Sequence, residues 1–111
     1  MMQVKIGCDI AEIKRFSNMD KKLLGKLFHK DELKNLKPQT LAGIFAAKES
    51  CKKVFNELDW SDIKIKKGKN GKPTLILNDK NIMENKIASF DISISHDGEY
   101  AIAAVVFLIN D

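Results

Sequence analysis

Two dipeptides, Asn70-Gly71 and Asp97-Gly98, constrain the fold of this chain more than any other feature. Each stands between two segments in which apolar and polar residues alternate. Such dipeptides favour tight hairpin turns, and alternation with a period of two is typical of half-buried strands. We therefore predict two antiparallel hairpins in the second half of the chain. Their strands are expected at 63–66, 73–77, 90–95 and 100–109.

The beginning of the chain has the same alternating pattern. Over residues 3–9, Val4, Ile6 and Cys8 share one face and Lys5, Gly7 and Asp9 share the other. This pattern predicts a further strand, and we expect the face with Val4 and Ile6 to point towards the core.

Helical spacing dominates between this strand and the first hairpin. Pro38 suits the first turn of a long helix, because its missing N–H has no partner at that position. An apolar side predicts that this helix continues to about Phe55; it consists of Leu41, Ile44, Phe45, the stem of Lys48, and Cys51. Shorter helical or turn segments are expected at 10–16, 21–28, 29–36 and 79–88.

Length and composition bound the overall architecture. The 111 residues, with 44% hydrophobic and 31% charged residues, are typical of one globular domain, which we place at 1–111. Helices in the first half and antiparallel strands in the second predict an α+β fold with helices packed on an antiparallel sheet. The net charge of +4 favours an anionic partner, such as a phosphorylated cofactor, an acidic protein or a nucleic acid.

The sequence also indicates where the protein works. No basic segment followed by an apolar run opens the chain, and no apolar stretch reaches the roughly 20 residues that cross a bilayer. The two cysteines, Cys8 and Cys51, form no metal-binding pattern. We expect a cytoplasmic protein that makes no membrane contact.

Two carboxylates are candidate metal ligands. Asp9 closes the first predicted strand, and Glu49 lies in an apolar stretch of the long helix. Glu49 could pair with Lys53 one helical turn later, and Asp9 could simply cap a strand or helix. Alternatively, both could hold Mg²⁺, which typically binds one or two carboxylates together with water and substrate phosphates.

Basic side chains near these acids are candidate phosphate contacts. Lys48 and Lys53 flank Glu49, and His96 follows the apolar positions of a predicted strand. The lysines could equally be surface residues and the histidine a structural one. The loop 66–73 is rich in lysine and glycine but lacks the spacing of a P-loop.

Three segments, in this order and spacing, resemble the holo-[acyl-carrier-protein] synthase family of 4'-phosphopantetheinyl transferases. Residues 6–16 (IGCDIAEIKRF) resemble its GxDIxEIxR opening, and residues 45–50 (FAAKES) look like its central helix. Residues 93–96 (SISH) look like the segment before its last strand, and residues 71–73 match a GKP turn. The resemblance covers nearly the whole chain.

This resemblance implies an activity and a set of site residues. Family members transfer the 4'-phosphopantetheine arm of coenzyme A to a serine of acyl carrier protein, with Mg²⁺, in fatty acid and lipid biosynthesis. They form trimers with active sites between subunits. By motif position, Asp9 and Glu49 are expected to bind the metal, with Lys53 also catalytic. The residues expected to contact coenzyme A are Lys48, Lys53, Gly71, Lys72, Pro73, Ser95 and His96. Lys14 and Arg15 are expected to face the carrier protein.

Some points stay open at this level. The base that accepts the serine proton could be Lys53, Glu49 or a water molecule. The family usually has an arginine where this chain has Ile44, and a glycine-rich turn where it has residues 56–59 (NELD). A small basic nucleic-acid-binding module and a non-catalytic family member remain alternatives, although no aromatic residues alternate with the basic ones as the former would require.

Overall fold

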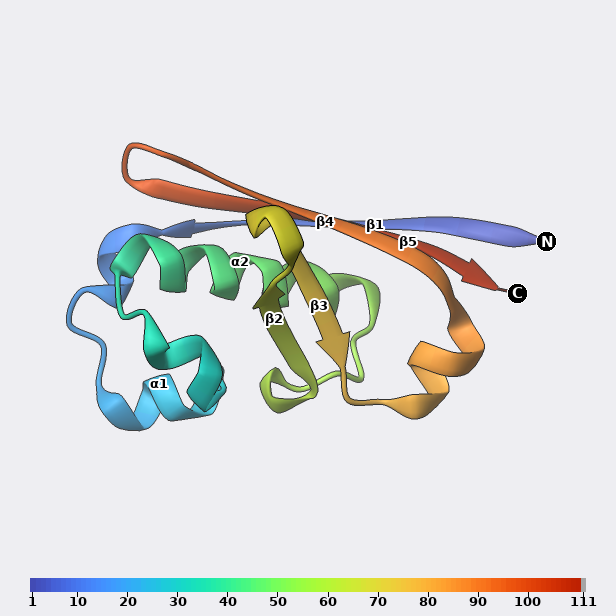
Figure 1. Cartoon of the computed structure of the whole chain (residues 1–111), viewed down its shortest axis with the longest axis horizontal. Coiled ribbons are helices and arrows are strands. Elements are labelled where there is room, and N and C mark those ends of the chain that lie inside the picture. Colours follow the sequence, from blue (N-terminus) through green and yellow to red (C-terminus); the bar gives the residue numbers. More distant parts are fainter. Residues whose placement is uncertain (111) are drawn as a thin grey trace.

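A three-stranded antiparallel sheet forms one layer of the computed structural model, which describes residues 1–110 apart from the side chain of Asn81. Its strands are β1 (Met2–Glu12), β4 (Ile87–Asp97) and β5 (Tyr100–Asn110), in the order β1-β5-β4. The two termini therefore lie side by side at one end (Figure 1). Asp111, the last residue of the predicted domain, lies outside the described residues.

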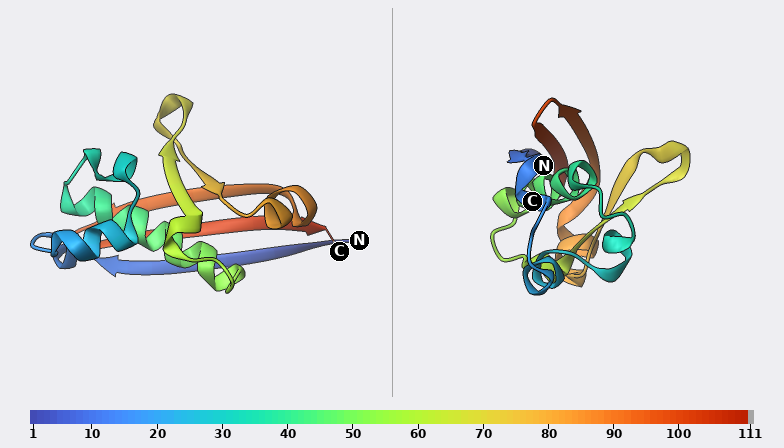
Figure 2. Two further views of the ribbon diagram at one scale, coloured as in Figure 1. Left: turned by 90° about the horizontal axis from the view of Figure 1, so that it is seen from below. Right: turned by 90° about the vertical axis from the view of Figure 1, so that its left-hand side faces the viewer.

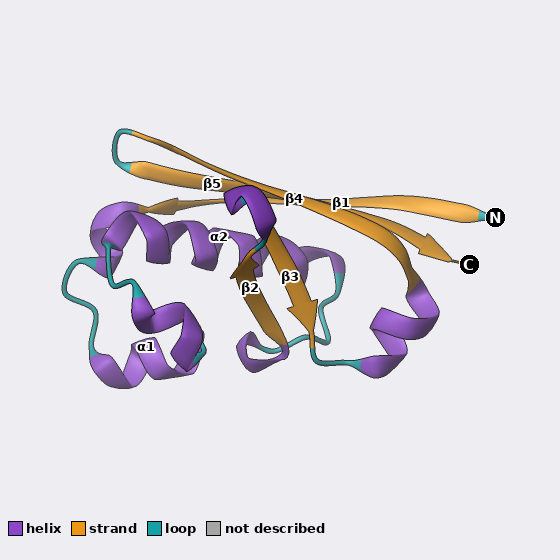
Figure 3. Cartoon of the chain, in the orientation of Figure 1, coloured by secondary structure: helices purple, strands orange, loops and turns teal. Residues whose placement is uncertain are grey.

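The long helix α2 (Pro38–Val54) packs along one face of this sheet (Figure 3). It is buried on nearly all sides, because small residues face the sheet and larger ones face the elements beneath. The buried residues are Leu41, Ala42, Gly43, Phe45, Ala46, Ala47, Lys48, Ser50 and Cys51. The helix thus forms the centre of the core.

Shorter elements complete the layer below α2. The hairpin of β2 (Ile63–Lys67) and β3 (Pro73–Leu77) is a separate two-stranded sheet whose tip projects from the body (Figure 2). The only other α-helix within residues 1–110 is α1 (Lys21–Leu27). The 3₁₀ segments are η1 (Ile13–Phe16), η2 (Lys30–Lys34), η3 (Trp60–Asp62) and η4 (Lys69–Gly71), and η5 (Asn81–Lys86) is a π-helical turn. The predicted elements and the α+β class are confirmed.

The expected orientation of the first strand is wrong. Gly7 and Ala11 of β1 face α2 and are buried, whereas Val4 and Ile6 are 68% and 74% exposed on the opposite face. The reason is steric: a Cβ on Gly7 would lie 2.0 Å from the Ser50 carbonyl oxygen. Only the face with small side chains allows the strand to approach the helix this closely.

The outer face of the sheet is consequently apolar and uncovered in the single chain. Ile10 and Ile102 are 59% and 44% exposed there. A continuous apolar sheet face of this kind is a typical site of contact with another protein surface. No helix within residues 1–110 is long and apolar enough to cross a membrane.

Candidate active site

Asp9 and Lys53 form the first part of the site. The Lys53 ammonium donates to Oδ1 of Asp9 at 3.0 Å and to the Cys8 carbonyl oxygen at 2.8 Å. The close contact of Gly7 with Ser50 brings this end of β1 against the last turns of α2. The Ser50 hydroxyl donates to the Ala46 carbonyl oxygen at 2.7 Å, and its oxygen also lies 3.2 Å from the carbonyl oxygen of Ala103, the cross-strand partner of Asp9. Strand and helix are thus fixed to each other next to Asp9.

Glu49 lies on the same part of α2, one residue before Ser50 and one turn before Lys53. Positions four apart lie on the same face of a helix, so the Glu49 carboxylate is on the side from which Lys53 reaches Asp9. Carboxylate and carbonyl oxygens are the hard donors that Mg²⁺ prefers. Residues 1–110 contain no group of three or more acidic, histidine or cysteine side chains that could hold a metal. A cation at Asp9 and Glu49 would therefore need water or substrate oxygens to complete its shell. We call Asp9, Glu49 and Lys53 the carboxylate half.

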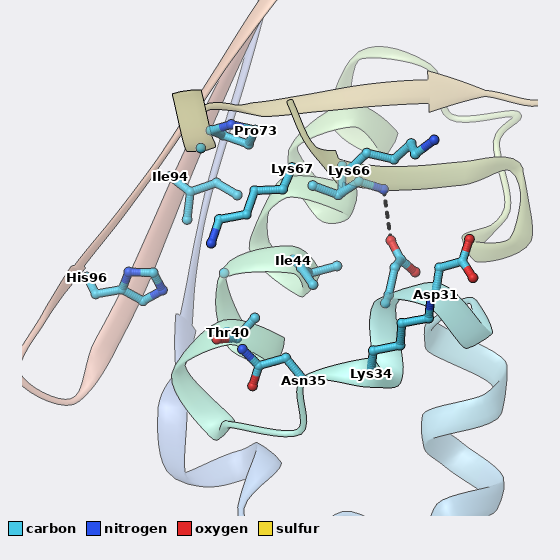
Figure 4. A pocket seen from close by; sticks show the side chains of 14 residues that line it. Asp31, Lys34, Asn35, Thr40, Ile44, Lys66, Lys67, Pro73, Ile94 and His96 are labelled. Atoms are coloured by element: carbon cyan, nitrogen blue, oxygen red, sulfur yellow. Dashed lines mark hydrogen bonds between the residues drawn. The ribbon is translucent and has the colours of Figure 1, made fainter. Parts of the chain in front are cut away.

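A pocket of about 450 Å³ forms the second part of the site. It is bounded by η2 and the start of α2, by the β2–β3 hairpin, and by the end of β4 (Figure 4). The lining residues used below are Lys67, Gly71, Pro73 and His96, which we call the pocket half. Lys67 points across the pocket towards His96, whereas Lys66 points away (Figure 4).

The pocket is positively charged because its acids are already paired. Lys64 beside Asp31 holds the pKa of that carboxyl below its ordinary value, first through a hydrogen bond and then through its charge. The Glu32 carboxylate is buried against Lys48. Three lysines line the pocket, Lys34, Lys66 and Lys67, and Lys67 points into a volume without a compensating free carboxylate (Figure 4). Such a pocket suits a ligand with several phosphate oxygens.

The position of His96 depends on Gly43. A Cβ on Gly43 would lie 3.0 Å from Nε2 of His96 and 2.9 Å from Cγ2 of Ile94, so only glycine lets the end of β4 lie this close to α2. His96 Nε2 lies 2.8 Å from the Gln39 carbonyl oxygen. A carbonyl oxygen only accepts, so Nε2 carries the proton in this bond and Nδ1 is left for the pocket.

The two halves lie on opposite flanks of α2 within one chain. Asp9 of β1 and Ile94 of β4 both pair with Ala103 of β5, so they lie on opposite sides of that strand. Helix α2 packs over the three strands and separates the two positions. Asp9, Glu49 and Lys53 do not line the pocket. A single chain therefore does not bring the two halves into one cavity.

Known proteins with this sequence and fold identify the family. The 4'-phosphopantetheinyl transferase superfamily matches residues 5–105 of the chain. The chain is 39% identical over 110 residues to the holo-[acyl-carrier-protein] synthase of Sulfurimonas denitrificans, covering 90% of this chain and 91% of that protein.

Solved structures agree. The structure of the Helicobacter pylori holo-[acyl-carrier-protein] synthase with coenzyme A is 36% identical and has a TM-score of 0.82, covering 93% of this chain and 99% of that one. A Bacillus anthracis synthase solved with 3',5'-ADP is 31% identical with a TM-score of 0.80, covering 99% and 100%. The chain belongs to the 4'-phosphopantetheinyl transferase superfamily. The prediction of a transferase of this family from the sequence motifs is confirmed.

Lys48 does not have the role expected from the motif of the superfamily. Its side chain is fully buried, and Nζ donates to Oε1 of Glu32 at 2.6 Å and to the Leu27 carbonyl oxygen at 2.8 Å. Burial lowers its pKa, while the hydrogen bond with Glu32 opposes that shift. An amine enclosed in this way cannot reach a phosphate from solvent, so the expected phosphate contact of Lys48 is wrong in this structure.

Two other expected coenzyme A contacts also lie outside the pocket lining. The Lys72 ammonium pairs with Asp91 at 2.9 Å, and Ser95 is exposed on β4. Gly71, Pro73 and His96 do lie together in the pocket.

The residues expected to face the carrier protein are exposed on η1, which directly follows β1. Lys14 extends into solvent, and the Arg15 guanidinium lies 5.1 Å from the centre of the Phe45 ring. The Phe45 ring in turn stacks on Trp60, over which Lys52 is placed at 4.0 Å. Arg15 is therefore held by aromatic packing while remaining accessible.

The departures from the family pattern have structural consequences. Ile44, which replaces the usual arginine, lines the pocket, so the missing charge would have belonged there. Lys67 from the lysine-rich loop lines the same pocket, whereas Lys52 is engaged with Trp60. Sequence reasoning missed Gly43, although a glycine inside a helix is itself a signal of close packing.

Proposed function

We propose that this chain is a Mg²⁺-dependent holo-[acyl-carrier-protein] synthase. It transfers 4'-phosphopantetheine from coenzyme A to a serine of apo acyl carrier protein and releases adenosine 3',5'-bisphosphate. The observation that carries the proposal is the pocket half: three residues of the family's motifs, Gly71, Pro73 and His96, line one cationic pocket. The chain is also 36% identical to a synthase solved with coenzyme A. We also propose that the protein works in the cytoplasm.

In the reaction, one bond to the β-phosphorus of coenzyme A forms and another breaks. The serine oxygen of the carrier protein attacks the β-phosphorus of coenzyme A, and the bond from that phosphorus to the bridging oxygen breaks. The bridging oxygen leaves with adenosine 3',5'-bisphosphate, and the serine proton passes to a base. Transfer of this kind depends mainly on positioning and charge neutralisation. Mg²⁺ bound by Asp9 and Glu49 would supply a Lewis acid at the diphosphate.

The remaining side chains position the substrate and balance its charge. Lys67 and His96 would bind phosphate oxygens of coenzyme A, while the hairpin turn at Gly71 and Pro73 would lie along its nucleotide. Lys53 is ion-paired with Asp9 and also donates to the Cys8 carbonyl oxygen, so its positive charge already lies at a proposed metal ligand. We therefore assign Lys53 a charge-neutralising role, and the serine proton passes to a carboxylate or to water.

We propose that the active site is completed by a second copy of the chain, in a homotrimer. The carboxylate and pocket halves are separated by α2 in one chain, and the outer sheet face with Val4, Ile6 and Ile10 is apolar and exposed. Assembly through that face would cover it and would let the carboxylate half of one copy meet the pocket half of the next.

Mixing two impaired variants tests this arrangement. Asp9→Asn removes the carboxylate half and His96→Ala weakens the pocket half, so each alone should retain only a small fraction of the wild-type activity. Refolded together, they should recover activity, because mixed assemblies contain some sites with both halves intact. Ile6→Lys should give a monomer in sedimentation. Absence of any recovery from mixtures shown to contain mixed assemblies would contradict a shared site.

The direct test of function is transfer itself. Wild-type protein incubated with apo acyl carrier protein, coenzyme A and Mg²⁺ should increase the carrier mass by one phosphopantetheine. Asp9→Asn and Glu49→Gln should abolish the increase, whereas Glu57→Gln, an exposed acid in the loop after α2, should retain it. For the carrier surface, Arg15→Ala should raise KM for the carrier protein but leave KM for coenzyme A unchanged. No transfer by the wild-type protein would refute the proposed activity.

A further inference from the structure

The buried carboxylate of Glu32 connects three elements that are distant in sequence. Its Oε1 accepts from the His29 backbone N–H at 2.7 Å and from Lys48 Nζ at 2.6 Å. Its Oε2 accepts from the Ile65 backbone N–H at 2.8 Å. Glu32 is 5% exposed, and Lys48 is not exposed at all. One ion pair thus joins η2, α2 and strand β2.

These contacts replace a missing neighbouring strand. β2 pairs with β3 along one edge only, and an unpaired edge leaves backbone groups without partners. On the open edge, Ile65 N–H donates to Glu32, which is the dashed line in Figure 4. Nε2 of His29 lies 3.1 Å from the Ile63 carbonyl oxygen on the same strand. The side chains of one short segment therefore bind two successive positions of β2.

The strand fixed in this way leads directly into the pocket wall. Lys67 closes β2, and the turn with Gly71 and Pro73 follows it. All three line the pocket, as does Glu32 itself. By contrast, no contact of α1, η2 or α2 with the backbone of the hairpin tip, residues 68–72, is found among the hydrogen bonds of the described residues. The Lys72 side chain does pair with Asp91 of β4, but both are exposed, so the position of the tip depends mainly on how firmly β2 is held at its base.

We propose that Glu32 and Lys48 are positioning residues for nucleotide binding: they hold the β2–β3 hairpin so that it forms one wall of the pocket. This inference rests on the proposed function, because it takes the pocket to bind the nucleotide of coenzyme A. Lys48 acts through Glu32 and does not touch the substrate. Neighbouring residues of α2 then serve the two halves of the site, Glu49 as a metal ligand and Lys48 as the support of the hairpin.

Simple stabilisation does not account for the pair. Replacing a buried ion pair by well-packed apolar side chains is often neutral or stabilising, because two charges no longer have to be desolvated. Apolar side chains at positions 32 and 48 could fill the same space, but they could not bind the Ile65 N–H and so could not fix the strand. Thus a loss of hairpin position, separate from a loss of overall stability, distinguishes the two roles.

The deciding variant is Glu32→Leu/Lys48→Met. A single substitution leaves a buried charge without its partner, whereas this double substitution removes both charges at similar volume. Three experiments are used. Amide hydrogen exchange of residues 63–77 is measured in the free protein, and calorimetry gives the affinity for adenosine 3',5'-bisphosphate. Steady-state kinetics gives kcat and KM for coenzyme A. Glu57→Gln and Lys22→Met, which change exposed residues of the same charge types, are the matched controls.

The double variant should remain folded by circular dichroism. Its hairpin amides should exchange about tenfold faster, and its nucleotide affinity should fall about tenfold, the scale of one or two hydrogen bonds. KM for coenzyme A should rise by a similar factor, with kcat nearly unchanged. His29→Phe, which keeps the ion pair but removes the second contact with β2, should give smaller changes in the same direction, about threefold.

A folded double variant with wild-type hairpin exchange and wild-type affinity would overturn the inference, as would a loss of kcat at constant KM. If the double variant does not fold, the proposal is tested with His29→Phe alone. Wild-type hairpin exchange and wild-type nucleotide affinity in His29→Phe would then count against the proposal. Failure of the proposed function gives a different result: the wild-type protein itself would bind no adenosine 3',5'-bisphosphate. Hydrogen exchange would then still report whether the pair holds the hairpin.

Discussion

The ammonium group of Lys53 lies 3.0 Å from Oδ1 of Asp9. The side chain that precedes it by one turn on the same helix is Glu49. A divalent cation bound by Asp9 would therefore compete with, or be repelled by, a positive charge that already lies at this carboxylate.

Removing the Lys53 charge should strengthen metal binding. We expect Lys53→Met to bind Mn²⁺ roughly threefold to tenfold more tightly, because a partly exposed unit charge at this distance contributes on the order of 1 kcal/mol. Turnover should fall nevertheless, since the charge that neutralises the diphosphate is lost.

The concentration of free Mn²⁺, followed by electron paramagnetic resonance, gives the affinity. Lys52→Met, which removes the neighbouring lysine from the Trp60 ring, is the control. Mn²⁺ affinity that is equal in the two variants would contradict a direct effect of Lys53.

The contact between Gly7 and Ser50 gives a steric prediction. A Cβ at position 7 would lie 2.0 Å from the Ser50 carbonyl oxygen, so Gly7→Ala must push β1 away from α2. We expect it to lower the melting temperature and to abolish metal-dependent transfer, because Asp9 and Glu49 lie on the two elements that separate. Gly25→Ala is the matched control: no atom lies within 4 Å of its added Cβ, and alanine should stabilise α1 by about 0.5–1 kcal/mol. Equal melting temperatures for the two variants would refute this steric account.

The sequence predicted the elements well but not which surfaces they bury. The Asx-Gly turns and the alternation of apolar residues identified the hairpins, because these signals are local. The orientation of β1 was wrong because alternation defines two faces without saying which one meets the helix. The orientation is set by the close contact of Gly7 with Ser50, a residue 43 positions later in the sequence.

The sequence likewise predicted some residues of the candidate site correctly and missed the role of another. Motif resemblance placed His96, Gly71 and Pro73, and the structure brings them into one pocket. It also suggested Lys48 as a phosphate contact, because a lysine beside a candidate metal ligand has that chemistry. Its actual partner is Glu32, whose carboxylate binds it inside the core. Nothing in the local sequence around either residue indicates this pairing.

The buried thiol of Cys51 makes stability depend on pH at alkaline values. Burial raises the pKa of Cys51 from 9.0 to about 12. Above pH 9 the unfolded chain releases this proton while the folded chain keeps it, so the stabilising contribution is complete below pH 9 and is lost progressively towards pH 12. Between pH 8 and pH 10 the stability difference between wild type and Cys51→Ala should shrink by about 1.4 kcal/mol. Urea unfolding at the two pH values measures it, and other titrating groups cancel in the difference. A difference that stays constant would mean that Cys51 ionises equally in both states.

The close approach of Gly43 to the end of β4 predicts a selective effect on substrate binding. An alanine Cβ there would lie 2.9 Å from Cγ2 of Ile94 and 3.0 Å from Nε2 of His96, so the imidazole must move away from the Gln39 carbonyl oxygen. We expect Gly43→Ala to raise KM for coenzyme A about tenfold, the equivalent of one lost charge-assisted hydrogen bond. Overall stability should change less, because alanine improves the helix by up to about 1 kcal/mol and offsets part of the strain.

Steady-state kinetics with coenzyme A as the varied substrate measures the first effect, and thermal unfolding measures the second. Gly25→Ala again controls for helix propensity. If KM for coenzyme A is unchanged while His96→Ala raises it, Gly43 does not position the histidine. If neither variant changes KM, His96 does not contact the substrate.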